Sequence, residues 1–270
     1  MYVVHGNAGH VVQGVRPTTY HALTDTSRYH VLAIDYRGFG RSTGSPTEKG
    51  LILDAVTTVN WAISVAGVSP ERIGMSSDRP EPGLADFGPV LLGHSIGTAV
   101  TAAVAEHFAK EGVDFAGVVL VAGFSSLPTM LSGYSIAGYV PILAPFRVSP
   151  WLLHHLMRFV VDKWLSADRL RDTVTMVKAR NGTLNLHLVH AWNDRDIPYY
   201  EDDKLFAAAI NGLTTERDPG ISEEDLKAEK AARTVHRGNR SFTTTWKDEK
   251  ITIRQELFPH GGASKLTKGR

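Results

Sequence analysis

The sequence contains no cysteine, no long hydrophobic run and no marked excess of either charge. Without cysteine, the chain has no disulfide scaffold, no thiolate metal site and no cysteine nucleophile. No stretch of 18 apolar residues occurs, so no segment is expected to span a bilayer by itself. Lys and Arg number 29 against 28 Asp and Glu, for a net charge of +1. A nucleic-acid-binding protein typically carries a strong basic excess, so we expect no nucleic-acid partner.

What is present is an ordinary globular composition, with 43% hydrophobic and 21% charged residues. The length of 270 residues is enough to bury one large core. We therefore predict a single domain over residues 1–270, interrupted by an apolar insertion at 124–165 and a charged insertion at 211–240.

Short apolar runs alternate with helical patterns along the chain and indicate an α/β fold. The runs are rich in Val, Leu and Ile and are apolar on both faces, which is typical of buried parallel strands. Strand and helix in alternation predict a mostly parallel, doubly wound sheet. The expected strands are 2–4, 30–36, 90–92, 117–122, 184–190 and 251–258, and the expected helices are roughly 51–66, 96–110 and 199–210.

The two insertions differ in character. Residues 124–165 are densely apolar without a strand pattern, and they lie where α/β folds bind ligands, at the carboxyl ends of the strands. We predict a helical lid over an apolar pocket, with additional core as the alternative. The candidate substrate-binding residues of the lid are Leu131, Tyr134, Trp151 and Leu156.

Residues 211–240 carry 12 charged residues and predict a solvated surface segment with a helix near 221–235.

The motif Gly-x-Ser-x-Gly occurs twice, and its surroundings distinguish the two copies. Gly40–Gly44 lies between loops, whereas Gly93–Gly97 follows an apolar strand and opens a helical pattern. A sharp turn from strand to helix exposes a serine at its tip, above a helix N-terminus. We therefore predict Ser95, and not Ser42, as a nucleophile.

A serine hydroxyl needs a base to become a strong nucleophile, and in enzymes built on such a turn the acid and the histidine follow the serine in that order. Of the 12 histidines, only His236 and His260 lie after a plausible acid. His260 comes directly after the last expected strand, so it is the predicted base. Asp194 and Asp196 both follow the strand 184–190, and position alone leaves the acid open between them.

Acyl transfer also needs two N–H donors for the oxyanion. We predict the backbone of Ile96, next to the nucleophile, and a second donor at Asn7 in the loop after the first strand. No HExxH motif or clustered His and Asp spacing occurs, so neither a metal nor another cofactor is implied.

Four segments, HGNAG, DYRGFGRSTG, GHSIG and HAWNDRDIP, occur in an order that resembles the α/β-hydrolase superfamily. More narrowly, the chain is similar to membrane-associated serine hydrolases that cleave monoacylglycerols and lysophospholipids. In the related pattern His-Gly-x-x-Asp-x-x-Val-Pro the aspartate is the catalytic acid, which assigns that role to Asp194 over Asp196. The resemblance further implies hydrolysis of a lipid acyl ester without a cofactor, contact with a membrane surface, and a location at the endoplasmic reticulum.

The sequence departs from these relatives at both ends. Relatives have two strands before the HGNAG strand, whereas four residues precede His5 here, so the first edge strands are expected to be missing. Residues 30–36 would then form an open sheet edge that promotes aggregation or dimerisation. Many relatives place the catalytic histidine directly after paired glycines, where this chain has Ala263. Two alternatives therefore stand beside a lipase: a small-ester or peptide hydrolase, and a hydrolase fold that serves as a non-catalytic binding module.

Overall fold

The structure is a computed structural model of the chain. It describes residues 2–4, 10–14, 16–25, 30–68, 90–133, 135–136, 140–141, 160–214 and 221–261.

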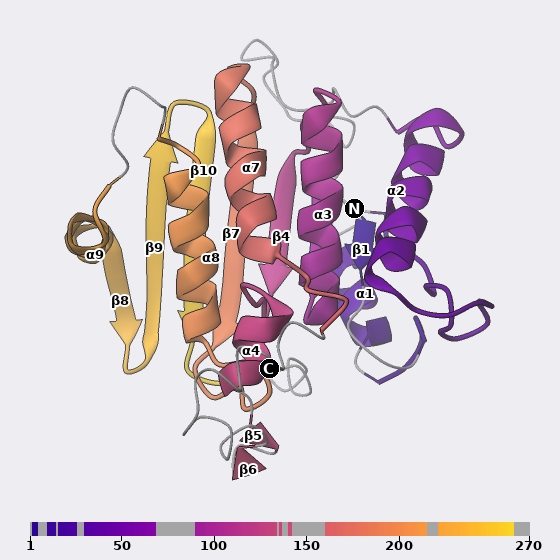
Figure 1. The fold of residues 1–270 in the computed structure, drawn as a ribbon, viewed down its shortest axis with the longest axis horizontal. Coiled ribbons are helices and arrows are strands. Elements are labelled where there is room, and N and C mark those ends of the chain that lie inside the picture. Colours follow the sequence, from indigo (N-terminus) through magenta and orange to yellow (C-terminus); the bar gives the residue numbers. More distant parts are fainter. Residues whose placement is uncertain are drawn as a thin grey trace.

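A sheet of eight strands forms the centre of the described structure, in the order β2-β1-β3-β4-β7-β10-β9-β8 (Figure 1). The six strands from β2 to β10 are parallel, β9 is antiparallel to β10, and β8 is antiparallel to β9. This mostly parallel α/β sheet confirms the predicted fold class. The strands are β1 (Tyr2–Val4), β2 (Leu32–Ala33), β3 (Val90–His94), β4 (Gly117–Val121), β7 (Leu184–Ala191), β8 (Thr234–Gly238), β9 (Ser241–Asp248) and β10 (Ile251–Phe258).

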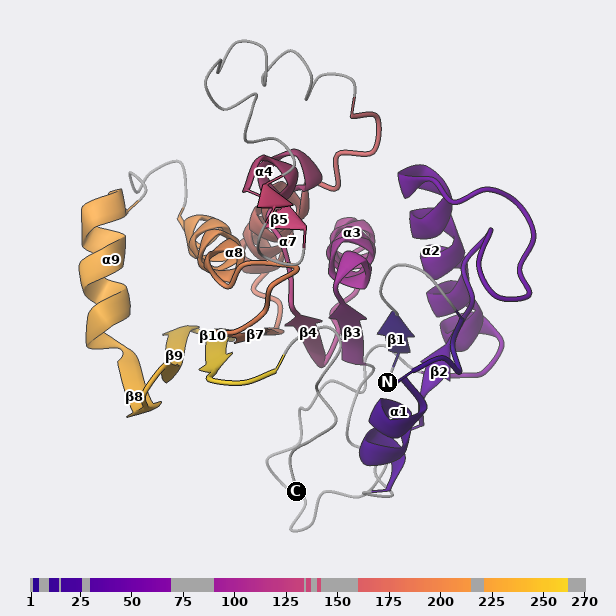
Figure 2. The same cartoon turned by 90° about the horizontal axis from the view of Figure 1, so that it is seen from below.

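Helices cover one face of this sheet. Figure 2 shows α2, α3, α7 and α8 on that side, and α1 on the other. A small separate pair, β5 (Ser135–Ile136) and β6 (Val140–Pro141), is antiparallel. The helices are α1 (Arg16–Thr24), α2 (Glu48–Ser64), α3 (Ile96–Lys110), α4 (Leu127–Gly133), α7 (Ser166–Ala179), α8 (Tyr200–Asn211) and α9 (Glu223–Ala232).

The core lies between the sheet and these helices. Side chains alternate across a strand, and every second residue of β7 faces the helices and is buried, including Leu184, Leu186 and Leu188. Helix α3 contributes mainly alanines with Val100 and Val104, all buried. Small side chains allow α3 to pack closely on β3, and this fixes the start of the helix at the carboxyl edge of the sheet.

The charged segment 211–240 is only partly as expected. Helix α9 has no buried residue and begins at Ser222, whose hydroxyl accepts a hydrogen bond from the backbone N–H of Asp225, so it is the solvated helix that the sequence predicts. Residues 234–238, however, form β8 and extend the sheet. Strand β9 was not expected either. Its run of threonines at 243–245 lacks the continuous apolar character of the parallel strands, although Thr244 and Trp246 are buried.

At the opposite edge, β2 pairs with β1 and is the last of the described strands. This agrees with the expected open edge at residues 30–36, although the strand itself is shorter than expected. Most of the expected lid, 124–165, lies outside the described residues. Near the carboxyl end of this segment, Trp164 is buried, and its backbone N–H donates to Glu48 Oε2 at 3.0 Å.

Candidate active site

Ser95 occupies the sharp turn between β3 and α3. Its backbone angles are φ 55° and ψ −125°, and its N–H donates to the carbonyl of Val121 at 3.0 Å. A positive φ is rare and costly for a residue other than glycine, and such strain is concentrated at functional sites. The turn thus has the strand–serine–helix form expected for a nucleophile.

Close packing explains the first glycine of this motif. A Cβ on Gly93 would lie 2.5 Å from the carbonyl oxygen of Gly97 and 2.6 Å from Thr101 Oγ1, so the turn closes only with glycine there. The second Gly-x-Ser-x-Gly copy differs. Ser42 lies in a loop, and its hydroxyl donates to the carbonyl of Asp35 at 2.7 Å. Ser95 thus lies at a strand-to-helix turn and Ser42 in a loop, and the choice of Ser95 as the nucleophile stays a prediction.

The two predicted oxyanion donors follow neighbouring strands of the sheet: Ile96 comes after β3 in the chain, and Asn7 comes after β1. Ile96 is the first residue of α3, and N–H groups in the first turn of a helix have no partner within the helix. Val4, the last residue of β1, lies opposite Gly93 in the register of the sheet, so the chain leaves β1 at the same edge as the serine. Asn7 itself lies outside the described residues.

Asp194 lies in the loop after β7, two strands from Ser95 at the same edge of the sheet. Its Oδ1 accepts hydrogen bonds from the N–H groups of Asp196 (2.9 Å) and Ile197 (3.1 Å). Its side chain is 1% exposed, and Oδ2 has no hydrogen-bond partner among the described residues. A buried carboxylate oxygen without a partner is costly, so Oδ2 is available to a donor. Asp196, by contrast, is exposed.

A buried histidine–aspartate pair lies beneath this loop. The Nε2 of His190 lies 2.9 Å from the carbonyl oxygen of Ile197 and 4.0 Å from Asp194 Oδ2. Its Nδ1 lies 3.7 Å from Oδ1 of Asp202, in the first turn of α8. Because a carbonyl can only accept, Nε2 carries a proton. The pair thus ties the loop of Asp194 to α8. Neither residue has a role predicted from the sequence, since nothing in the spacing shows that they meet.

Burial and charge shift the pKa values of these groups in different directions. Burial alone would lower the pKa of His190, but the nearby carboxylate of Asp202 and the hydrogen bond to the carbonyl of Ile197 outweigh it, so the pKa of His190 is raised. Burial raises the pKa of Asp202. Burial also lowers the pKa of His94, against the opposing charge of Asp194.

His260 lies in the turn directly after β10, the strand next to β7. Its side chain is exposed, and within the described part of the chain it forms no hydrogen bond or ion pair. The neighbouring Gly261 donates its N–H to Asn193 Oδ1 at 2.9 Å, so this turn contacts the loop that carries Asp194. The assignment of His260 as the base remains a prediction.

The expected lid residues cannot be placed against this site. Leu131 belongs to α4, and Tyr134, Trp151 and Leu156 lie outside the described residues. Within the ranges that the structure describes, no helix combines the length and apolar character needed to cross a membrane.

An eight-stranded, mostly parallel sheet with a serine at a strained strand-to-helix turn defines a class of α/β enzymes. The comparison with known sequences agrees, since the pattern that defines the Alpha/beta hydrolase family matches residues 1–246. The chain belongs to this family. The match ends before His260 and therefore says nothing about that residue.

Individual proteins of known sequence or structure are also similar to this chain. The chain is 30% identical over 212 residues to human Protein ABHD12B, covering 77% of this chain and 49% of that protein. It is 32% identical over 206 residues to the zebrafish (Danio rerio) Lysophosphatidylserine lipase ABHD12, covering 76% and 46%. The chain thus spans about half the length of these relatives. Among solved structures, an alpha-beta hydrolase from Vibrio vulnificus has the same fold, with a TM-score of 0.54 at 17% identity over 98% of this chain and 69% of that one.

Proposed function

We propose that this hydrolase is a serine esterase that cleaves the acyl ester of a lipid, such as a monoacylglycerol or a lysophospholipid. The observation that carries the proposal is the strained Ser95 at the same sheet edge as Asp194, whose buried Oδ2 has no described partner. The similarity to proteins named lysophosphatidylserine lipases supports a lipid substrate.

In the proposed reaction, the Ser95 hydroxyl attacks the acyl carbonyl while His260 takes its proton. Asp194 orients His260 and stabilises the imidazolium, and the N–H groups of Ile96 and Asn7 hold the oxyanion. His260 then gives its proton to the leaving alcohol as the acyl-enzyme forms. A water molecule, activated by His260, hydrolyses the acyl-enzyme and releases the fatty acid. This cycle consumes one water and needs neither a metal nor another cofactor.

A fluorophosphonate probe tests the activated serine directly, because it reacts covalently with serine hydrolases. We expect labelling of the folded protein at Ser95, identified by peptide mass spectrometry, together with hydrolysis in a panel of acylglycerols and lysophospholipids. Labelling without lipid hydrolysis, but with hydrolysis of short esters or peptides, would retain the serine mechanism and replace the substrate class.

One observation favours a second function, a non-catalytic binding module. The ring of His260 is exposed and has no described partner, although a base must reach Ser95 during catalysis. If this second function holds, the probe leaves Ser95 unlabelled while the folded protein still binds a lipid ester in equilibrium binding measurements.

A further inference from the structure

A histidine ring lies between two buried carboxylates, directly beneath the loop of Asp194. The ring belongs to His190, near the end of β7. Its Nε2 lies 4.0 Å from Oδ2 of Asp194, and its Nδ1 lies 3.7 Å from Oδ1 of Asp202. Within the described part of the chain, neither carboxylate oxygen of Asp202 nor Oδ2 of Asp194 has a hydrogen-bond partner. The ring of His190 therefore lies where a positive charge would compensate both carboxylates.

The hydrogens on this ring decide its charge. Nε2 carries one, because it lies 2.9 Å from the carbonyl oxygen of Ile197, which can only accept. If Nδ1 carried none, its lone pair would face the buried carboxylate of Asp202, and this arrangement is costly. A proton on Asp202 would remove that cost, but the ring would then offer no charge to Asp194. With a hydrogen on both nitrogens, the ring is an imidazolium that pairs with both carboxylates.

Contacts on both sides fix the place of this ring. The carbonyl that it contacts belongs to Ile197, whose own N–H donates to Oδ1 of Asp194 at 3.1 Å. On the other side, α8 carries Asp202 and packs on β7 and β10 (Figure 1). The start of α8 is also held by Glu201, whose Oε2 accepts from the N–H of Ser125 at 2.9 Å and from its hydroxyl at 2.6 Å. Asp202 thus has a fixed position against which the ring is oriented.

We propose that His190 and Asp202 are positioning residues for Asp194, a role that rests on the proposed function. Asp202 keeps the ring of His190 charged and oriented. The ring in turn holds the loop through the carbonyl of Ile197 and attracts Oδ2 of Asp194 through its charge. Because the side chains of His190 and Asp202 are 0% and 1% exposed, neither contacts the substrate. The pair therefore acts on the rate of the chemical step and not on substrate binding.

Nuclear magnetic resonance of the full chain, with isotopically labelled histidine, measures the charge of the ring without measuring catalysis. Near neutral pH we expect the nitrogen shifts of an imidazolium for His190, and those of a neutral ring in Asp202→Asn. In ester hydrolysis, Asp202→Asn should lower kcat about 100-fold and leave KM unchanged, because a small displacement of a catalytic group has an effect of that size. The matched control is Asp203→Asn, one residue further along α8, where the carboxylate pairs with Lys230 at 2.6 Å. Its kcat should equal that of the unaltered protein.

Three results would overturn the proposal. A neutral His190 ring in the unaltered protein is the first, and it requires no variant to fold. Equal kcat values for the two asparagine variants, or a change confined to KM, are the others. All three leave labelling of Ser95 by the fluorophosphonate probe intact. Failure of the proposed function differs, because the unaltered protein would then be neither labelled nor active, and the positioning role would fail with it. Circular dichroism melting of each variant ensures that kcat is compared between folded proteins.

Discussion

At the scale of single residues, substitution of the two candidate serines tests which one is the nucleophile. Ser95→Ala removes the attacking oxygen, and loss of a triad member costs about 10⁴-fold or more in turnover. Ser42→Ala is the matched control, because the same change in the other Gly-x-Ser-x-Gly copy removes only a hydrogen bond to the carbonyl of Asp35, at about 1 kcal/mol of stability. Steady-state ester hydrolysis with both variants measures the difference. Abolished turnover in a folded Ser42→Ala protein, with turnover retained in Ser95→Ala, would assign the nucleophile to the other motif.

His187 makes one contribution to the pH dependence of stability. Its Nε2 lies 3.4 Å from Glu256 Oε2, yet burial outweighs that carboxylate and lowers its pKa from the ordinary 6.5. The unfolded chain therefore takes up the proton more readily, and stability falls as the pH drops below about 6.5. Each unit of lowering corresponds to about 1.4 kcal/mol.

Replacing His187 by Gln should flatten this dependence. The free energy of unfolding, measured with urea at several values from pH 8 to pH 5, should fall more steeply for the unaltered protein than for His187→Gln. If the free energy of unfolding depends on pH in the same way for the two proteins, protonation of His187 does not contribute to that dependence.

Whole elements show how far the sequence predicts the structure. Strand β10 was predicted with its observed bounds, and β3, β4 and β7 within two residues, because continuous apolar runs are typical of buried parallel strands. Strand β9 was not predicted, because its threonines do not form an apolar run and are buried only through the elements packed around them. For the site, motif order predicts Ser95 as the nucleophile and Asp194 as the acid, and these roles stay predictions. The pairing of His190 with Asp202 depends on the direction in which two side chains face, which one sequence does not encode locally.

The lid segment carries a prediction about substrate length. If residues 124–165 line an apolar pocket, each buried methylene of an acyl chain contributes about 0.8 kcal/mol, or roughly four-fold in kcat/KM. Activity should rise steeply over the first several carbons and then level off when the pocket is full. A series of p-nitrophenyl esters from acetate upward measures kcat/KM against acyl chain length. If kcat/KM does not change with chain length, the lid does not bind the acyl chain.

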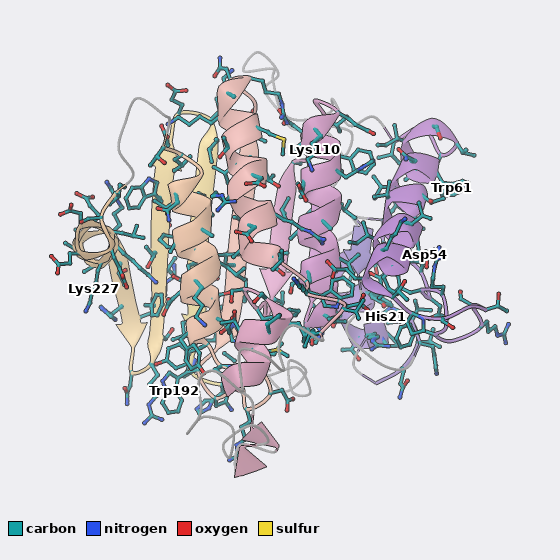
Figure 3. All side chains as sticks on the ribbon, in the orientation of Figure 1. His21, Asp54, Trp61, Lys110, Trp192 and Lys227 are labelled. Atoms are coloured by element: carbon teal, nitrogen blue, oxygen red, sulfur yellow. The ribbon has the colours of Figure 1, made fainter. Side chains whose placement is uncertain are left out.

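At the scale of the whole molecule, the open edge at β2 predicts self-association. Strand β2 has an unpaired side among the described strands, and an apolar groove of about 330 Å³ beside it is lined by Leu32, Val59 and Trp61. Trp61 is 50% exposed on α2 (Figure 3). Charged side chains beside an edge strand oppose edge-to-edge pairing, so Trp61→Lys should shift a dimer toward the monomer.

Light scattering after size exclusion, at several protein concentrations, measures this shift. Leu53→Lys is the control, because Leu53 is 54% exposed on the same helix but does not line the groove. A monomer at every concentration for the unaltered chain, with slow amide exchange throughout residues 30–36, would show that the edge is covered.

The succession of β8, β9 and β10 has a consequence for the order of folding. These strands are consecutive in the chain and joined by short turns, whereas each parallel neighbour pair, such as β4 with β7, closes a long loop before any strand contact forms. Local pairings form in microseconds, and distant ones are slow. The residues from Thr234 to Phe258 can therefore assemble first and present β10 as a template on which β7 docks.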